Sequence, residues 1–166
     1  DIEGVAVCSG PGRFTSIRVG MTFAGVLAKC LGVPAAAVSR IEASGCRILS
    51  RKEYPDGKYA VSLPGFRGES FLQEFRKRRG AVAPAGEPRW RTVADSGPVP
   101  SVIDAGLLVP SALDLIPLAE AVLRKGGGKV HPLYLKPANF LRAHNEISGA
   151  IRRPDVEPIS RREERA

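Results

Sequence analysis

A helical pattern over residues 14–31 is apolar almost all the way round, and it constrains the fold of this chain more than any other feature. Only Arg18 and Lys29 are charged in this range. Small residues recur at every fourth position and form a stripe: Ser16, Gly20, Ala24 and Ala28. A helix that is apolar on several sides must be covered on more than one of them, and small residues let another helix approach closely. We therefore expect one face to lie on a sheet and another to contact a second helix, from upstream residues or from another protein.

Two different patterns of strands and helices divide the chain. The first half alternates strand, helix, strand and helix at residues 2–8, 14–31, 35–38 and 40–49. This alternation predicts a parallel strand pair with right-handed crossovers. The second half predicts strands at 58–63, 70–75 and 89–94 with a loop over 80–88, then a helix at 111–123 and a short strand at 133–135. The change of pattern predicts a first lobe at 1–50, a second lobe at 58–137 and a polar tail at 138–166.

The composition is that of a globular protein with a basic surface. Hydrophobic residues make up 43% and charged residues 25%, which is ordinary. No apolar run approaches the roughly 20 residues that span a bilayer, so we expect no membrane contact. The net charge of +8 concentrates in residues 67–91 and 124–144. Such basic regions suit RNA, or they only solvate the surface.

The three cysteines, Cys8, Cys30 and Cys46, lie among apolar residues and form no Cys-x-x-Cys pair. Their odd number argues against a disulfide framework or a zinc ribbon. We expect buried thiols in a reducing, cytoplasmic compartment. The chain begins at Asp1 on what is already a core strand, so we expect upstream residues to be absent.

The glycine loop before the long helix allows two interpretations. Gly10 and Gly12 can present backbone amides outward, and Thr15 or Ser16 can cap the helix, whose N-terminus favours anions. The candidate anion-binding residues are Gly10, Gly12, Arg13, Thr15 and Ser16. However, a P-loop needs a Lys-Ser/Thr pair, and the dinucleotide fingerprint needs a third glycine where Thr15 stands. Since both are missing, we favour a corner that directs the helix toward a partner.

Four motifs, in order along the chain, resemble those of the TsaB (YeaZ) family. GPGRFTSIRVG at 10–20 is similar to the family's Gly-Pro-Gly-Ser-Phe-Thr-Gly-Leu-Arg-x-Gly. GVPAAAVSRIEA at 32–43 resembles Gly-Ile-Pro followed by Val-Ser-Ser-Leu-Glu-Ala. FRGESF at 66–71 and PLYLK at 132–136 resemble Arg-x-Gly-Glu-Val-Tyr and Pro-x-Tyr-Leu-Arg. The first motif is specific, and the others gain weight from their order.

The resemblance implies an α/β fold of the ASKHA type (actin-like, sugar-kinase-like, ribonuclease H-like) with two lobes, the first incomplete at its N-terminus. It implies a non-catalytic subunit that pairs with the catalytic paralogue TsaD, and acts with the ATPase TsaE, in threonylcarbamoyladenosine modification of tRNA. ATP and metal are then expected on the paralogue, and a homodimer is a further expectation. The expected interface residues are Phe14, Ile17, Arg18, Gly20, Met21 and Ala24.

One departure separates this chain from the catalytic paralogue, whose His-x-x-x-His pair places two imidazoles on one helix face for a metal. Arg40 and Ser44 occupy those positions here, and arginine cannot replace imidazole as a ligand. The two histidines, His131 and His144, lie in loop-like contexts, and we expect neither catalytic nor metal-binding residues. The alternatives are an enzyme of the same superfamily (an ATP-binding transferase or a glycoprotease-like peptidase) and a standalone RNA-binding protein.

Overall fold

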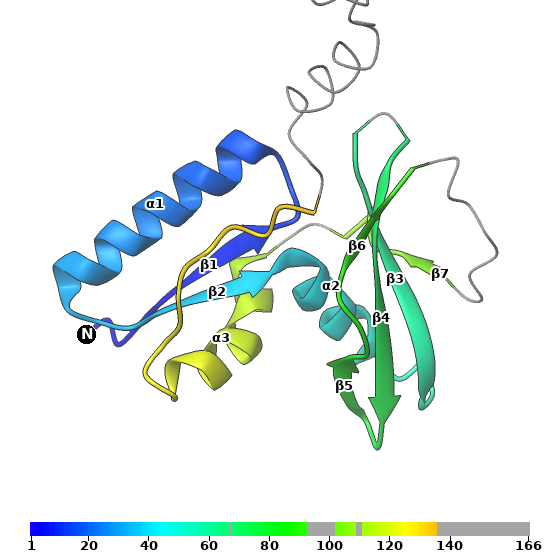
Figure 1. Ribbon diagram of the computed structural model, residues 1–166. Coiled ribbons are helices and arrows are strands. Elements are labelled where there is room, and N and C mark those ends of the chain that lie inside the picture. The colour runs from blue at the N-terminus through cyan, green and yellow to red at the C-terminus, as the bar shows by residue number, and fades with distance from the viewer. Residues whose placement is uncertain (67, 93–101, 109–110, 136–166) are drawn as a thin grey trace, which may run out of the picture. The chain divides into compact units, whose positions relative to one another are not determined.

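The computed structural model describes residues 1–66, 68–92, 102–108 and 111–135, which form one compact unit that ends at Leu135. The predicted polar tail and His144 lie outside the described residues. Figure 1 shows two separate sheets with a helix between them. The first sheet has two strands and the second has five.

The first sheet and its helices follow the alternation expected from the sequence. In order, the elements are β1 (Val5–Gly10), α1 (Phe14–Leu31), β2 (Ala35–Ser39) and α2 (Arg40–Leu49). The two strands are parallel, with Val5 opposite Ala35 and Cys8 opposite Val38. Both predicted helix ranges are confirmed to the residue. Gly32 ends α1 because it adopts a left-handed conformation (φ 67°), in which its N–H reaches the last carbonyls of the helix.

The second sheet is larger than the sequence predicted. It contains β3 (Gly57–Pro64), β4 (Ser70–Arg78), β5 (Ala81–Pro84), β6 (Arg89–Arg91) and β7 (Val102–Asp104). Its order is β5-β4-β3-β7, with β6 also paired to β4. The predicted loop over 80–88 is right only for residues 85–88. Arg79 and Gly80, both with positive φ, form a two-residue turn from which β5 continues the hairpin. The short β7 was not predicted, and it pairs with β3 in parallel.

The predicted helix at 111–123 consists of a 3-10 turn, η2 (Ala112–Leu115), and a short helix, α3 (Ile116–Leu123). A capping box at Ser111 and Asp114 begins it. Ala119 of α3 packs on Ala36 and Val38 of β2, so this segment returns to the first sheet. The division into lobes at 1–50 and 58–137 stays a prediction. Residues 133–135 form no strand, although the Leu133 N–H donates to the Ser9 carbonyl at 2.8 Å.

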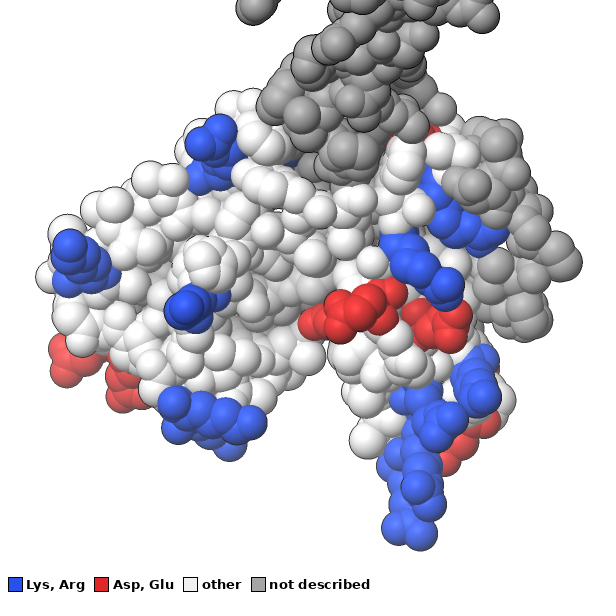
Figure 2. Space-filling model, in the orientation of Figure 1, with Lys and Arg blue, Asp and Glu red and all other residues white. Residues whose placement is uncertain are grey.

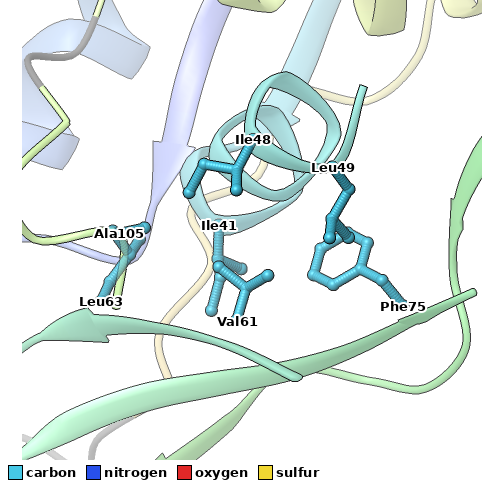
Figure 3. Packing of buried hydrophobic residues seen from close by; sticks show 7 residues of the cluster. All are labelled: Ile41, Ile48, Leu49, Val61, Leu63, Phe75 and Ala105. Atoms are coloured by element: carbon cyan, nitrogen blue, oxygen red, sulfur yellow. The ribbon is translucent and has the colours of Figure 1, made fainter. Parts of the chain in front are cut away.

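The main core lies between α2 and the second sheet. Figure 3 shows Ile41, Ile48 and Leu49 of α2 facing Val61, Leu63 and Phe75 of the sheet. Gly45 lies on the same side of α2, where the ring of Phe75 occupies the space that a side chain would need. A glycine in a helix usually weakens it, so this one is explained by the close approach of the ring.

A buried lysine completes the C-terminal end of α2. The Lys77 ammonium of β4 donates to the carbonyls of Leu49, Arg51 and Tyr54 at 2.5, 3.0 and 2.8 Å. The last carbonyls of a helix have no partner within the helix, and the helix dipole favours a cation there. Lys77 therefore joins β4 to the end of α2.

Candidate partner-binding surface

The buried face of α1 holds three of the six residues that the sequence analysis assigned to an interface, Ile17, Met21 and Ala24. Ile17, Met21, Ala24 and Ala28 are all at most 7% exposed within the chain itself. Gly20 is half-buried, and a Cβ there would lie 3.9 Å from Val7 of β1, an ordinary contact. Three of the four small residues, Gly20, Ala24 and Ala28, therefore lie on the side of α1 that packs within the chain, whereas Ser16 is exposed.

The opposite face of α1 is apolar and exposed. Val19, Phe23 and Val26 are 64%, 69% and 57% exposed, and Cys30 is exposed beside them. We call these four residues the α1 stripe. Single exposed apolar residues are ordinary, but several along one helix face mark an interaction surface. Burial of all three cysteines was therefore a wrong expectation, although all three are free.

An open groove of about 430 Å³ runs along one side of the α1 stripe. Its walls come from α1 and from the segment that follows α3, and its lining residues are Arg18, Met21, Thr22, Gly25, Val26, Lys29, Val130, Pro132 and Tyr134. Tyr134 also stacks on Phe14, with ring centroids 4.8 Å apart. The Arg18 guanidinium lies 5.1 Å from the centroid of the Phe14 ring. The segment at 130–134 is thus held against the start of α1.

Two of the predicted interface residues, Phe14 and Arg18, are exposed, and each also contacts the chain's own side chains. Ile17, Met21 and Ala24 are buried, although Met21 also lines the groove, and Gly20 is partly exposed. Participation of these six residues in an interface stays a prediction. The apolar α1 stripe was visible in the sequence as part of a wide apolar face, but its exposure was not.

The glycine loop has the geometry of a corner. Gly10 has φ 114°, and a Cβ there would lie 2.9 Å from Ile17 and 3.0 Å from the Leu133 carbonyl oxygen. Arg13 precedes α1 without a side-chain cap hydrogen bond, so the predicted cap from Thr15 or Ser16 is wrong. Both hydroxyls lie within the first turn and are exposed. Anion binding at Gly10, Gly12, Arg13, Thr15 and Ser16 stays a prediction.

The start of α2 carries Arg40 and Ser44, the two residues that the family resemblance sets at the positions of the paralogue's histidines. Arg40 and Ser44 are both partly buried, and the Arg40 Nε has no hydrogen-bond partner among the described residues. Within the described ranges, no group of three or more His, Cys, Asp or Glu side chains could hold a metal ion. Burial, and secondarily the charge of Glu42, raise the pKa of the Cys46 thiol, which favours its protonated form.

By length and composition alone, α1 could cross a membrane, since it has 18 residues and only two of them are charged. The expectation that no such stretch exists was therefore wrong. Core helices of soluble proteins and signal sequences pass the same test, so it carries little weight. It does show that only 22% of the residues of this helix are buried within the chain.

The family described as "TsaD: tRNA N6-adenosine threonylcarbamoyltransferase" matches residues 1–88, more than half of the chain. An uncharacterized protein of Mycobacterium leprae is 29% identical over 169 residues, which cover 96% of this chain and 41% of that protein. The tRNA threonylcarbamoyladenosine biosynthesis protein TsaB of Bacillus subtilis is 29% identical over 82 residues, which cover 49% of this chain and 34% of TsaB.

Among solved structures, a protein with similarity to peptidase YeaZ from Pseudomonas aeruginosa has a TM-score of 0.66 and 22% identity. The match covers 81% of this chain and 74% of that one. This likeness confirms the predicted ribonuclease H-like, ASKHA-type α/β fold.

Proposed function

The chain belongs to the tRNA N6-adenosine threonylcarbamoyltransferase family, as a TsaB/YeaZ-like member, and we propose that it is a non-catalytic subunit that binds a TsaD-like paralogue. The binding surface in this proposal is the α1 stripe with the adjoining groove. The similarity to TsaB of Bacillus subtilis supports the further proposal that this subunit acts in threonylcarbamoyladenosine modification of tRNA.

The α1 stripe is the observation that carries this proposal. Val19, Phe23 and Val26 together present a continuous apolar face on a helix whose other side is already packed. Fully burying one such side chain contributes about 1.5–3 kcal/mol. Because each of them is more than half exposed here, burial under a partner helix would recover a large part of that free energy. A second helix packed on this face is the cover that the apolar helix requires.

The absence of a paired-imidazole motif supports the non-catalytic part of the proposal. Arg40 and Ser44 stand where the catalytic paralogue has its metal-binding histidines, and a guanidinium carries no lone pair for a metal. In this proposal ATP and metal bind to the paralogue, a TsaE-like ATPase acts with the pair, and the assembly works on tRNA in the cytoplasm. Metal analysis and a protease assay on the purified chain test the rival peptidase function that the name YeaZ has carried.

The test of partner binding is sedimentation of the chain mixed with its cognate TsaD-like paralogue. We expect a heterodimer at micromolar concentration and its loss in Phe23→Asp, because a carboxylate would be buried in an apolar contact. Leu107→Asp is the matched control, since Leu107 is 96% exposed and lies outside α1. Two independent species with the wild-type chain would refute the proposal, and equal weakening by both variants would refute the assignment to the α1 stripe.

Cys30 provides an independent probe of the same surface. It is exposed within the α1 stripe, whereas Cys8 and Cys46 are partly buried. Binding of the paralogue should slow alkylation of Cys30 by a maleimide and leave the other two thiols unchanged. Protection of Cys30 by a second copy of the chain, or by phospholipid vesicles, and not by the paralogue, would contradict the proposed partner.

A further inference from the structure

The three antiparallel strands β3, β4 and β5, with the turn between β4 and β5, carry four exposed basic side chains. These are Lys58, Arg76, Arg78 and Arg79, which we call the basic strip. Residues alternate along β4, so that Phe75 and Lys77 are buried while Arg76 and Arg78 are exposed. Arg76 and Arg78 therefore lie on one face of β4, with their Cα atoms about 6.8 Å apart. Figure 2 shows Lys and Arg side chains gathered over the end of the β4–β5 hairpin, with a smaller acidic area beside them.

The register of the strands brings the charges of the basic strip together without neutralising them. Lys58 lies directly opposite Arg76 in the β3–β4 pair. On the other side, β5 places alanines opposite Arg76 and Arg78. Like charges in directly opposed positions destabilise a sheet. This arrangement therefore costs free energy in the isolated chain, and an anionic ligand would recover it.

The carboxylates nearest the basic strip are already engaged. Glu74 forms an ion pair with Arg89 at 2.6 Å. Asp56 accepts the backbone N–H groups of Arg79 and Gly80, and these bonds, with a smaller contribution from Lys77 and Arg78, lower its pKa. Within the part of the chain that the structure describes, no side chain of the basic strip forms an ion pair closer than 4 Å.

The turn at the end of the hairpin holds an arginine in a conformation that disfavours it. Arg79 has φ 51°, and turns of this kind ordinarily use Asn or Gly because other residues are strained there. The two hydrogen bonds from the turn to Asp56 stabilise this conformation. Strained residues that the surrounding structure holds in place often have a function. We infer that Arg79 is kept at this turn because its guanidinium adds a fourth positive charge to the basic strip.

We propose that the basic strip binds the sugar-phosphate backbone of tRNA. Three of its four residues are arginines, whose planar guanidinium groups bind phosphate through paired hydrogen bonds. Double-stranded RNA is recognised mostly by its shape and by contacts to its phosphates and 2′-hydroxyl groups, and phosphate contacts supply much of the affinity. A bilayer fits less well, because β3, β4 and β5 expose no large apolar side chain that could insert into it. The choice of tRNA rests on the proposed function, but the basic strip shares no residue with the α1 stripe.

The experiment measures binding of the full chain to an unmodified tRNA transcript by fluorescence anisotropy over a series of salt concentrations. Four phosphate contacts predict a log–log salt slope of about −2.8 to −3.6, or a loss of affinity of about 50- to 150-fold between about 50 and 200 mM salt. The variant Lys58→Gln/Arg76→Gln/Arg78→Gln should flatten the slope by about 2 to 3. The matched control is Arg124→Gln/Lys125→Gln/Lys129→Gln, which removes the same charge from exposed positions elsewhere.

A flattened slope in the basic-strip variant and a steep one in the control would support the proposal. Equal losses in the two variants would overturn it, because the basic strip would then contribute no more to binding than the second basic region at 124–144. No loss in the basic-strip variant, or a strip-dependent affinity for phosphatidylserine vesicles and not for tRNA, would overturn it as well. Thermal unfolding of both variants checks that they are folded. The basic-strip variant should still bind the TsaD-like paralogue, because the basic strip is separate from the α1 stripe. If the wild-type chain itself does not bind the paralogue, that result refutes the proposed function and leaves the tRNA result to be judged separately.

Discussion

Replacing Gly45 by alanine should destabilise this protein, although alanine is the better helix former. An ideal Cβ at Gly45 would lie 2.3 Å from Cζ of Phe75 and 2.7 Å from both Cε atoms. Non-bonded carbon atoms attract best at about 3.5–4.0 Å, and real Cβ atoms essentially never approach closer than 3.0 Å, so the ring would have to move by about 1 Å. The ring cannot move freely, because Phe75 is fully buried in a core that is close-packed.

The expected magnitude is the difference between two effects. Overpacking a core costs about 1–3 kcal/mol, and the upper end applies because a whole aromatic ring must shift. Replacing glycine by alanine in a helix gains about 1 kcal/mol. The net loss is therefore about 2 kcal/mol, or about 4–8 °C in the melting temperature of a domain of this size. Thermal and urea unfolding followed by circular dichroism measure both quantities.

Two further variants decide whether the ring is the cause. Gly25→Ala in α1 is the matched control, since a Cβ there meets nothing within 4 Å, and it should be neutral or stabilising by up to about 1 kcal/mol. Phe75→Leu removes the ring, so Gly45→Ala should cost less in that background, with a coupling of about 0.5–3 kcal/mol. Gly45→Ala that is as stable as the wild type, or strictly additive with Phe75→Leu, would refute the reasoning.

Three other predictions concern stability. Lys77→Met should lower the free energy of unfolding in urea by about 1.5–3 kcal/mol, because it leaves buried carbonyls without a charged donor. Gly127→Ala should destabilise more than Gly126→Ala, since both have positive φ but only at Gly127 would a Cβ lie 2.9 Å from a backbone oxygen; equal unfolding midpoints would contradict this. Because the pKa of Asp56 is lowered by folding, its stabilising effect is present above pH ~3.8 and is lost as the pH falls below that value. The difference in stability between the wild type and Asp56→Asn should therefore shrink in acid, and a pH-independent difference would exclude this role of the charge.

The sequence by itself determined the local structure of the first half of the chain. The apolar period, Gly32 and the glycine loop define α1, and the strand–helix alternation defines a parallel pair, because these are short-range properties of the backbone and of side-chain spacing. The family resemblance also rests on short motifs, above all the one at 10–20. Element type and family were therefore within reach of the sequence.

The tertiary structure decided which face of α1 is free. A helix that is apolar all round gives no sign of which side lies on its own sheet, and only packing placed Ile17, Met21 and Ala24 inward and left Phe23 exposed. The short strands β5 and β7 likewise depend on pairing with β4 and β3, which lie outside the local sequence window. The basic strip was visible only as a basic region, and strand register was needed to set Lys58 opposite Arg76. In each case the deciding interaction joins residues that are far apart in the sequence, so a local sequence pattern cannot predict it.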